Sequence, residues 1–237
     1  MAEDIAPVLL SKVQKAFAQG LKSRGIGDTK AVKALAAQNK VKLHDYAVKV
    51  GDSLAEAYGK VITADALPDG TFYYNIANKV MRPTLEEAHG LVSDVADACQ
   101  TAQNKQIGIG LKPIRPPIEE DRLAGLIDAA TSGLFDDAVI YLDEPVKNIV
   151  DHFADHHLEK NAEFLENSGV STIVIRTADS GCCKWCAEKA GTYESYYEAR
   201  DNEAFGRHEG CRCDLEISSS RGRGKMRAVG HAFVRTT

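Results

Sequence analysis

The chain has 237 residues, which is long enough to bury a sizeable core as one large domain or two small ones. Its hydrophobic content of 44% and charged content of 27% are ordinary for a soluble globular protein, and its formal net charge is -5. No apolar run approaches the roughly 20 residues that span a bilayer, which argues against a membrane protein. Residues 1–4, Met-Ala-Glu-Asp, are acidic in net charge and lack the basic and apolar regions of a secretory signal, so we expect folding in a cytoplasm.

Residues 1–105 predict a helical N-terminal region. The first helix has an apolar stripe at i, i+4 spacing, formed by Ile5, Leu9, Val13, Phe17 and Leu21. The glycines of residues 25–27 end this helix, and Asp28 or Thr29 is expected to cap the next, shorter one. A third helix is predicted over residues 42–62. A long helical region follows over 74–103, which Pro83 should kink or interrupt because proline lacks an amide donor.

Residues 106–118 predict an extended connector, because three prolines and two glycines cannot form a helix there. This Pro/Gly connector is the expected boundary between the N-terminal region and a second domain over residues 119–217. The second domain should begin with a helix over 121–132. A longer helix follows from Pro145, which suits a first helical position, and Gly169 is expected to end it.

After Gly169 the sequence pattern changes from helix to strand. Residues 170–176 are rich in β-branched side chains and predict a strand. Residues 211–217 alternate, which places four side chains on one face, those of Cys211, Cys213, Leu215 and Ile217. The predicted fold class is therefore α+β: a mainly helical body with a small C-terminal sheet and a Cys/His zinc-knuckle-like site.

Five of the six cysteines lie in two short motifs of this sheet region. Residues 182–186 contain a C-x2-C motif, and residues 208–213 contain an H-x2-C-x-C motif. Thiolates and an imidazole at such spacing are typical ligands of a tetrahedral zinc ion. In a cytoplasm, clustered cysteines indicate metal ligands more readily than disulfides. Trp185, inside the first motif, is expected to pack over the site or in the core beside it.

The two motifs offer more donors than a tetrahedral ion can use. The candidate metal ligands are Cys183, Cys186, His208, Cys211 and Cys213. The C-x2-C pair is favoured by its spacing, and Cys182 is expected to point away. His208 with Cys211 is the favoured second pair, although Cys213 can replace either residue. Four protein ligands would make the Zn2+ structural. Free thiols, a disulfide and a catalytic metal are the alternatives.

A second group of histidines lies in residues 151–157. His152 and His156 are four residues apart on a predicted helix, as are the two histidines of the metal-binding H-E-x-x-H motif. Phe153 stands where that motif has its glutamate base. The favoured interpretation is therefore a polar helix face that carries histidines.

Several segments together resemble the phage minor head proteins, which are related to the F head-morphogenesis protein of phage Mu. The form of this family that the chain resembles is common in phages and prophages of Gram-positive bacteria. The resemblance covers roughly residues 107–230, more than half of the chain. The segments that carry it are Asp121-Arg122-Leu123-x-Gly125-Leu126-Ile127, Asn161-Ala162-Glu163-Phe164, Gly169, Arg176, Cys182-Cys183-x-Trp185-Cys186, Ala190-Gly191-x-Tyr193 and Arg207-His208-x2-Cys211-Arg212-Cys213.

The resemblance implies a structural minor capsid protein, present in few copies in the virion and assembled in the host cytoplasm. It implies action in phage head morphogenesis near the portal, with the portal, major capsid or scaffold protein as partner. A link to DNA packaging or delivery is also implied. It implies no catalytic residues and hence no enzyme. The alternative is a zinc-dependent DNA-binding protein or an HNH-like nuclease, for which His231 is the only spare histidine near the motifs.

Residues 218–237 form a basic tail with five basic residues and no acidic one. The basic residues are Arg221, Arg223, Lys225, Arg227 and Arg235. Such a tail is usually a solvated end. Contact with DNA or with an acidic partner surface is the more specific hypothesis.

Overall fold

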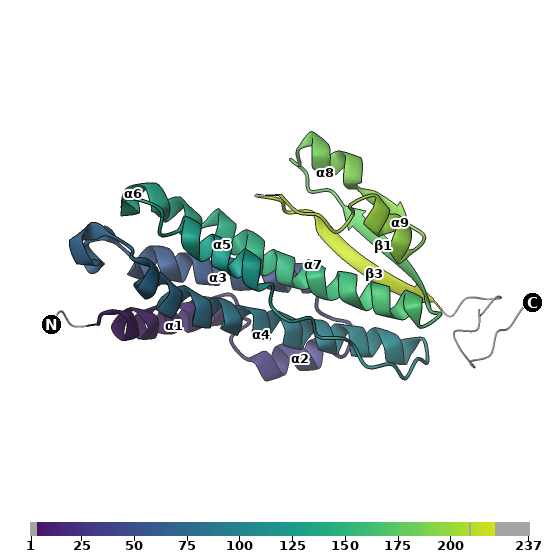
Figure 1. Cartoon of the computed structure of the whole chain (residues 1–237). Helices are drawn as coiled ribbons and strands as arrows, with labels where there is room; N and C mark the ends of the chain where they lie inside the picture. Colours follow the sequence, from purple (N-terminus) through teal and green to yellow (C-terminus); the bar gives the residue numbers. More distant parts are fainter. Residues whose placement is uncertain (1–3, 209, 221–237) are drawn as a thin grey trace, which may run out of the picture.

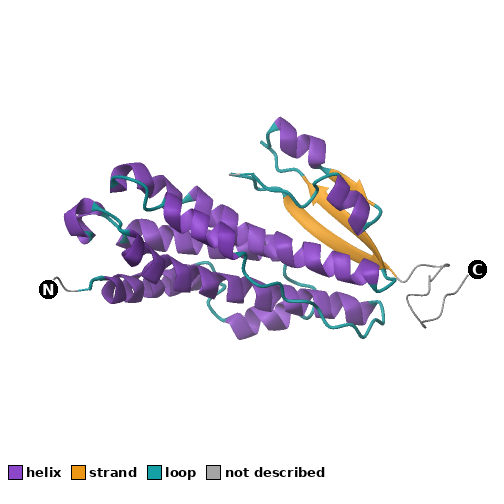
Figure 2. Ribbon diagram, in the orientation of Figure 1, coloured by secondary structure: helices purple, strands orange, loops and turns teal. Residues whose placement is uncertain are grey.

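The computed structural model of the chain describes residues 4–208 and 210–220. It has a mainly helical body and a small C-terminal sheet beside a Cys/His cluster, which confirms the predicted α+β class (Figures 1 and 2). In chain order the elements are α1 (Ala6–Ser23), α2 (Thr29–Ala36), α3 (Leu43–Val61), η1 (Ala64–Ala66), η2 (Pro68–Gly70), α4 (Tyr74–Gln106), α5 (Glu120–Ala129), α6 (Phe135–Ala138), η3 (Val139–Leu142), α7 (Glu144–Asn167), β1 (Ser171–Thr177), α8 (Lys184–Lys189), β2 (Gly191–Tyr193), α9 (Tyr196–Asp201) and β3 (Asp214–Ser220).

The helical body consists of α1 to α7, and its long helices α1, α3, α4 and α7 lie side by side (Figure 1). The predicted stripe on α1 faces the core, where Leu9, Val13, Phe17 and Leu21 are buried. Asp28 caps α2, as expected, because its carboxylate accepts a hydrogen bond of 3.1 Å from the amide of Ala31. The local signals in the N-terminal region therefore agree with the tertiary packing.

Pro83 does not interrupt α4, because the helix is continuous from Tyr74 to Gln106, so the interruption is wrong and a kink at Pro83 stays a prediction. The residues around the proline are buried in the core, namely Val80, Met81, Thr84 and Leu85. The Thr84 hydroxyl also donates to backbone carbonyls of the preceding turn. Burial of these side chains offsets the hydrogen bond that proline removes.

One hydrophobic core extends across the connector. Residues 107–119 contain neither helix nor strand, as predicted. However, Leu123 and Ile127 of α5 and Val146 and Val150 of α7 belong to the same buried cluster as the helices before the connector. The connector thus joins two parts of one core.

The sheet module comprises residues 170–220 and lies along α7, at the end of the body opposite the N-terminus (Figure 1). Its strands are antiparallel in the order β2-β1-β3, and Val174 of β1 pairs with Tyr193 on one side and Ile217 on the other. A second buried cluster joins this module to Ala162, in the C-terminal half of α7. Helix α7 therefore contributes to both cores.

Strand β3 begins at Asp214, which corrects the predicted strand over residues 211–217. Leu215 and Ile217 are buried on the strand as expected, whereas Cys211 and Cys213 are buried in the loop before it. The ladder between β1 and β3 ends where Thr177 pairs with Asp214. On the N-terminal side of Asp214 the chain leaves the sheet, and this preceding loop carries Cys211 and Cys213.

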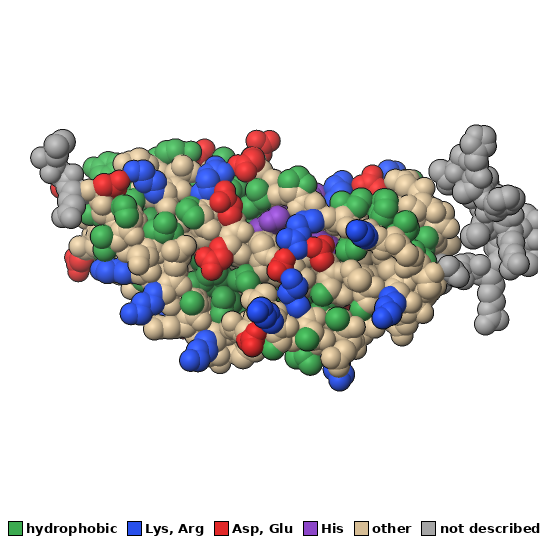
Figure 3. Space-filling model, turned by 90° about the horizontal axis from the view of Figure 1, so that it is seen from below, with side chains coloured by type: hydrophobic (Ala, Val, Ile, Leu, Met, Phe, Trp, Pro, Cys, Tyr) green, Lys and Arg blue, Asp and Glu red, His purple; other side chains and the backbone are tan. Residues whose placement is uncertain are grey.

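Among the described residues, no helix combines the length and the apolar character needed to cross a membrane. On the face of the molecule drawn in Figure 3, acidic and basic side chains are interspersed with scattered apolar ones.

Candidate metal centre

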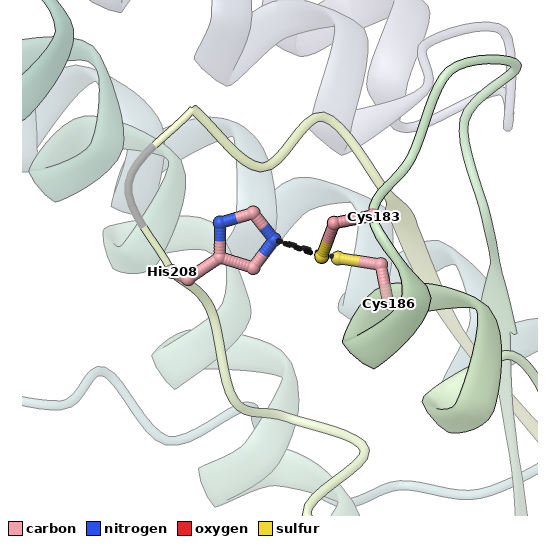
Figure 4. Close-up of side chains that lie close together, drawn as sticks. All are labelled: Cys183, Cys186 and His208. Atoms are coloured by element: carbon pink, nitrogen blue, oxygen red, sulfur yellow. Dashed lines mark hydrogen bonds between the residues drawn. The ribbon is translucent and has the colours of Figure 1, made fainter.

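The five predicted ligands come from two loops that meet at the edge of the sheet. Cys183 precedes α8 and Cys186 lies within it, while His208, Cys211 and Cys213 belong to the segment between α9 and β3. In Figure 4 the side chains of Cys183, Cys186 and His208 point toward one another. The fold thus brings together two motifs that are far apart in the sequence.

The donor atoms form two overlapping groups that share Cys186. Its Sγ lies 3.0 Å from His208 Nε2, which is 3.2 Å from Cys183 Sγ (Figure 4). The Cys186 Sγ also lies 3.6 Å from Cys211 Sγ, and Cys213 completes the second group. Within each group the donor atoms are all within 4.8 Å of one another.

These separations fit a bound metal ion. Zinc bonds of about 2.3 Å to sulfur and about 2.0 Å to nitrogen place tetrahedral ligand atoms about 3.5–3.8 Å apart. The separations of 3.0–3.6 Å in the structure are shorter than those values by up to about half an ångström. The predicted Cys/His cluster is therefore confirmed as a group of side chains able to hold a metal ion.

The sulfur atoms are free thiols rather than disulfides. All six cysteines are unbridged, and the 3.6 Å between the Sγ atoms of Cys186 and Cys211 is well beyond the roughly 2.05 Å of a disulfide bond. Cys182 packs against the cluster but belongs to neither group of candidate ligands among the described residues.

Burial disfavours the ionised form of a thiol, so whether the sulfur atoms carry charge depends on nearby cations. Cys186 is 1% exposed, and burial raises the pKa of its thiol to about 12. Cys183 is exposed, and the backbone N–H of Cys186 lowers the pKa of its thiol. The Arg176 Nη2 atom lies 3.5 Å from Cys211 Sγ and 3.8 Å from Cys186 Sγ. A metal ion would add positive charge where buried sulfur needs it to ionise.

Trp185 and Arg176 enclose the cluster. The Trp185 ring packs edge-on against His208, with centroids 5.7 Å apart, which confirms that this tryptophan lies over the site. The Arg176 guanidinium lies 5.4 Å from the centroid of the Trp185 ring. Its Nη1 donates hydrogen bonds of 2.7 Å to the carbonyl of Ala204 and 2.6 Å to that of Gly206. The enclosing side chains are thus anchored to the module's own backbone.

Arg207 fastens the second ligand loop to α7. Its guanidinium forms two hydrogen bonds, of 2.6 and 3.0 Å, with the carboxylate of Asp155. It also donates to the carbonyls of Cys211 at 2.8 Å and Cys213 at 3.1 Å. The Arg207 and Asp155 side chains are only 2% and 4% exposed. Sequence spacing gives no signal for this pair, although Arg207 stands next to His208 in the motif.

Two further contacts hold the same loop. Asn148 on α7 donates a hydrogen bond of 2.6 Å to the carbonyl of His208. Arg212, between the last two cysteines, lies 3.3 Å from the buried carboxylate of Asp151. The ligand loop is therefore attached to one face of α7 at several points.

The histidines of residues 151–157 lie in two environments. His157 is buried, and its Nε2 is 2.9 Å from Asp97 Oδ1, so it links α7 to α4. His152 and His156 lie near the surface beside Glu119, a residue that the sequence did not associate with them. Phe153, between them, is buried in the core of the body.

Comparisons of the chain with protein-family models, with curated proteins and with solved structures find no match. The likeness to phage minor head proteins rests on the sequence segments described above. His231, the spare histidine of the nuclease alternative, and the five basic residues of the tail lie outside the described residues.

Proposed function

We propose that this protein is a structural minor head protein of a tailed double-stranded DNA phage or prophage, acting in head assembly near the portal. The observation that carries the proposal is the convergence of the resembling segments. Arg176, the C-x2-C motif with its Trp185, and the H-x2-C-x-C motif are separate in sequence but form one cluster in space.

In this proposal the metal centre is a structural Zn2+ site with four protein ligands. The ligands are Cys183, Cys186, His208 and Cys211, with Cys213 as the residue that can replace His208 or Cys211. Two pairs of donors on separate loops would be joined by one ion, which would close the edge of the sheet module. Four protein ligands leave no coordination position for a water nucleophile, which favours a structural ion over a catalytic one.

The proposed partners are the portal, major capsid or scaffold protein. Support comes from the way the sheet module is attached to the body. The ion pair between Arg207 and Asp155, with the contacts of Asn148 and Arg212, holds the module against α7 at several points. A module held in one orientation is suited to a fixed position in a particle, where neighbouring subunits must meet in a defined geometry.

The experiment is co-expression of the full chain with the portal, major capsid and scaffold proteins encoded by the same phage genome. We expect the chain to co-purify with at least one of them and to be present in few copies in purified virions. The proposal is wrong if the chain is absent from purified virions and binds none of the three proteins.

The same preparation tests the nuclease alternative. The purified chain is incubated with plasmid DNA and Mg2+, Mn2+ or Zn2+, and we expect no cleavage. Metal-dependent cleavage that is lost in His208→Ala or His231→Ala would instead establish a zinc-dependent nuclease.

DNA contact is proposed for the basic tail from its charge alone. Neutralising about five phosphates would make the logarithm of affinity fall with the logarithm of salt concentration, with a slope of roughly -4 to -5. Gel shifts of the full chain and of a chain truncated after Ser220 measure this. If the full chain shifts no DNA even at low salt, the DNA hypothesis is wrong. The remaining interpretations of the tail are then contact with an acidic protein partner and a solvated end.

A further inference from the structure

A second set of potential metal ligands lies on the helical body, separate from the cysteine cluster. Glu119 ends the connector and directly precedes α5, whereas His152 and His156 lie one helical turn apart on α7. One donor atom from each of the three residues lies within 4.8 Å of the other two. The Glu119 carboxylate contacts Nε2 of His152 directly.

The two histidines present their rings to the same side of α7. Residues four apart lie on one face of a helix, and the two rings are stacked with centroids 5.7 Å apart and 28° between their planes. Their side chains are 13% and 15% exposed, and that of Glu119 is 43% exposed. An ion can therefore reach the donors from solvent while the helix limits the movement of the imidazoles.

The donor set selects a class of ion. Two imidazoles and one carboxylate suit divalent transition metals, and three protein ligands leave coordination positions open to water or to a partner's side chain. Two neighbours modify the site: Arg122 Nε lies 3.4 Å from Glu119 Oε2, and Glu159 Oε2 lies 3.9 Å from His156 Nδ1. Arg122 repels a cation and Glu159 attracts one, so these two neighbours act in opposite directions.

We propose that Glu119, His152 and His156 form a second metal site, which binds a divalent transition-metal ion such as Zn2+ or Co2+ through nitrogen and oxygen. The bound ion links the end of the connector and the start of α5 to α7. This site is independent of the cysteine centre and of the proposed role in the phage head. The competing explanation is a simple ion pair between Glu119 and His152 that joins the same two elements.

The experiment uses the full chain with its cysteine centre already loaded with Zn2+. Co2+ is titrated into it by calorimetry, and the absorption spectrum is recorded in parallel. We expect one Co2+ per chain to bind without the thiolate-to-cobalt charge-transfer bands that a cysteine site would produce. The melting temperature should rise with Co2+ concentration, because an ion that binds only the folded chain stabilises it.

Glu119→Gln separates the two explanations, because glutamine retains a hydrogen-bonding partner for His152 but removes the carboxylate. We expect Glu119→Gln and His156→Gln each to weaken Co2+ binding at least about tenfold, since even outer-shell partners of metal ligands contribute about that much. Glu120→Gln is the matched control, because its carboxylate is next in sequence and pairs with Arg82 at 2.6 Å. It should bind Co2+ as the unmodified chain does.

Three results would overturn the proposal. The first is Co2+ affinity that is equal in the unmodified chain, Glu119→Gln and His156→Gln. The second is Co2+ uptake that occurs only with charge-transfer bands, which would mean displacement of Zn2+ from the cysteines. Absence of any Co2+ binding to the zinc-loaded chain would likewise leave Glu119 and His152 as an ion pair only.

Discussion

The helical body and the sheet module bury different kinds of side chain. The largest fully buried side chains of the body include Phe17, Leu54, Tyr58 and Phe72, which belong to one continuous core. The module has one small apolar cluster and one cluster of cysteines, and it buries the charged side chain of Arg176. A large apolar core can be stable through burial alone, whereas a small module needs charge pairing or a metal ion in addition.

Helix α7 connects the two regions. Its N-terminal half contributes Val146 and Val150 to the body core, and its C-terminal half contributes Ala162 to the module. The helix should therefore remain folded with the body when the module loses its structure. Variants that damage one region selectively can test this asymmetry.

The largest effect is expected from loss of the cysteine metal centre. Cys186→Ser should remove the zinc held by the cysteine cluster, which is about one ion per chain. It should also unfold the sheet module, because structural zinc contributes roughly 10 kcal/mol or more of apparent folding free energy in small modules. Zinc analysis and hydrogen exchange measure the two outcomes, and the amides of α1, α3 and α4 should keep their protection.

Cys99→Ser is the matched control for this variant. Cys99 lies in the body, packed beside its core, and burial raises the pKa of its thiol to about 11. Its substitution should leave zinc content unchanged. A metal-free protein whose module is as stable as before would show that the cysteine cluster does not need an ion.

The next largest effect is expected from the buried ion pair that joins the regions. Arg207→Met leaves the Asp155 carboxylate buried without its partner, which typically costs about 3–5 kcal/mol. Arg24→Met is the exposed comparison, because Arg24 pairs with Glu56 at 3.0 Å on the surface and such pairs contribute about 0–1 kcal/mol. Denaturant unfolding measures both. Equal costs would mean that the pair does not hold the module to α7.

A cavity in the body core should have a somewhat smaller effect, which should lower the stability of the body as a whole. Leu54 is fully buried, so Leu54→Ala should lower the free energy of unfolding of the body by about 3 kcal/mol. The zinc content of the cysteine cluster should be unchanged, because its ligands lie outside this core. Loss of zinc from the folded variant would contradict the separation of the two regions.

The smallest effects concern two buried tyrosines of the body. The Tyr58 hydroxyl lies 2.6 Å from Thr84 Oγ1, whereas the Tyr46 hydroxyl has no hydrogen-bond partner among the described residues. Tyr58→Phe should therefore cost about 1 kcal/mol. Tyr46→Phe should be neutral or slightly stabilising at neutral pH. Thermal unfolding of the two variants compares them directly, and a larger loss for Tyr46→Phe would reverse the expected order.

Tyr46 also predicts a pH dependence. Burial, with a smaller effect from the charge of Asp94, raises the pKa of its hydroxyl to about 12. The unfolded chain ionises this group near pH 10, whereas the folded chain keeps it neutral to about pH 12. Ionisation of Tyr46 therefore has no effect on stability below about pH 10 and lowers the free energy of unfolding between about pH 10 and 12. Tyr46→Phe should reduce the loss of stability in that interval, as measured by denaturant unfolding at each pH.

The sequence by itself determined the features that depend on near neighbours. The stripe on α1, the Asp28 cap and strand β1 follow from side-chain spacing and hydrogen bonding within a few residues. The C-x2-C pair follows from the same local geometry. The short elements α8, β2 and α9 were not predicted, because a few residues carry too little periodicity to distinguish helix from strand.

Tertiary structure decided the features that depend on distant partners. Packing kept α4 continuous through Pro83, and the end of the β1–β3 ladder placed Cys211 and Cys213 in a loop. Contacts across the fold set Arg207 against Asp155 and brought Glu119 to His152. No spacing rule links these pairs, because their separation in space is fixed by how the elements pack. Local sequence patterns fix which face of an element is buried, but only the assembled core determines what that face meets.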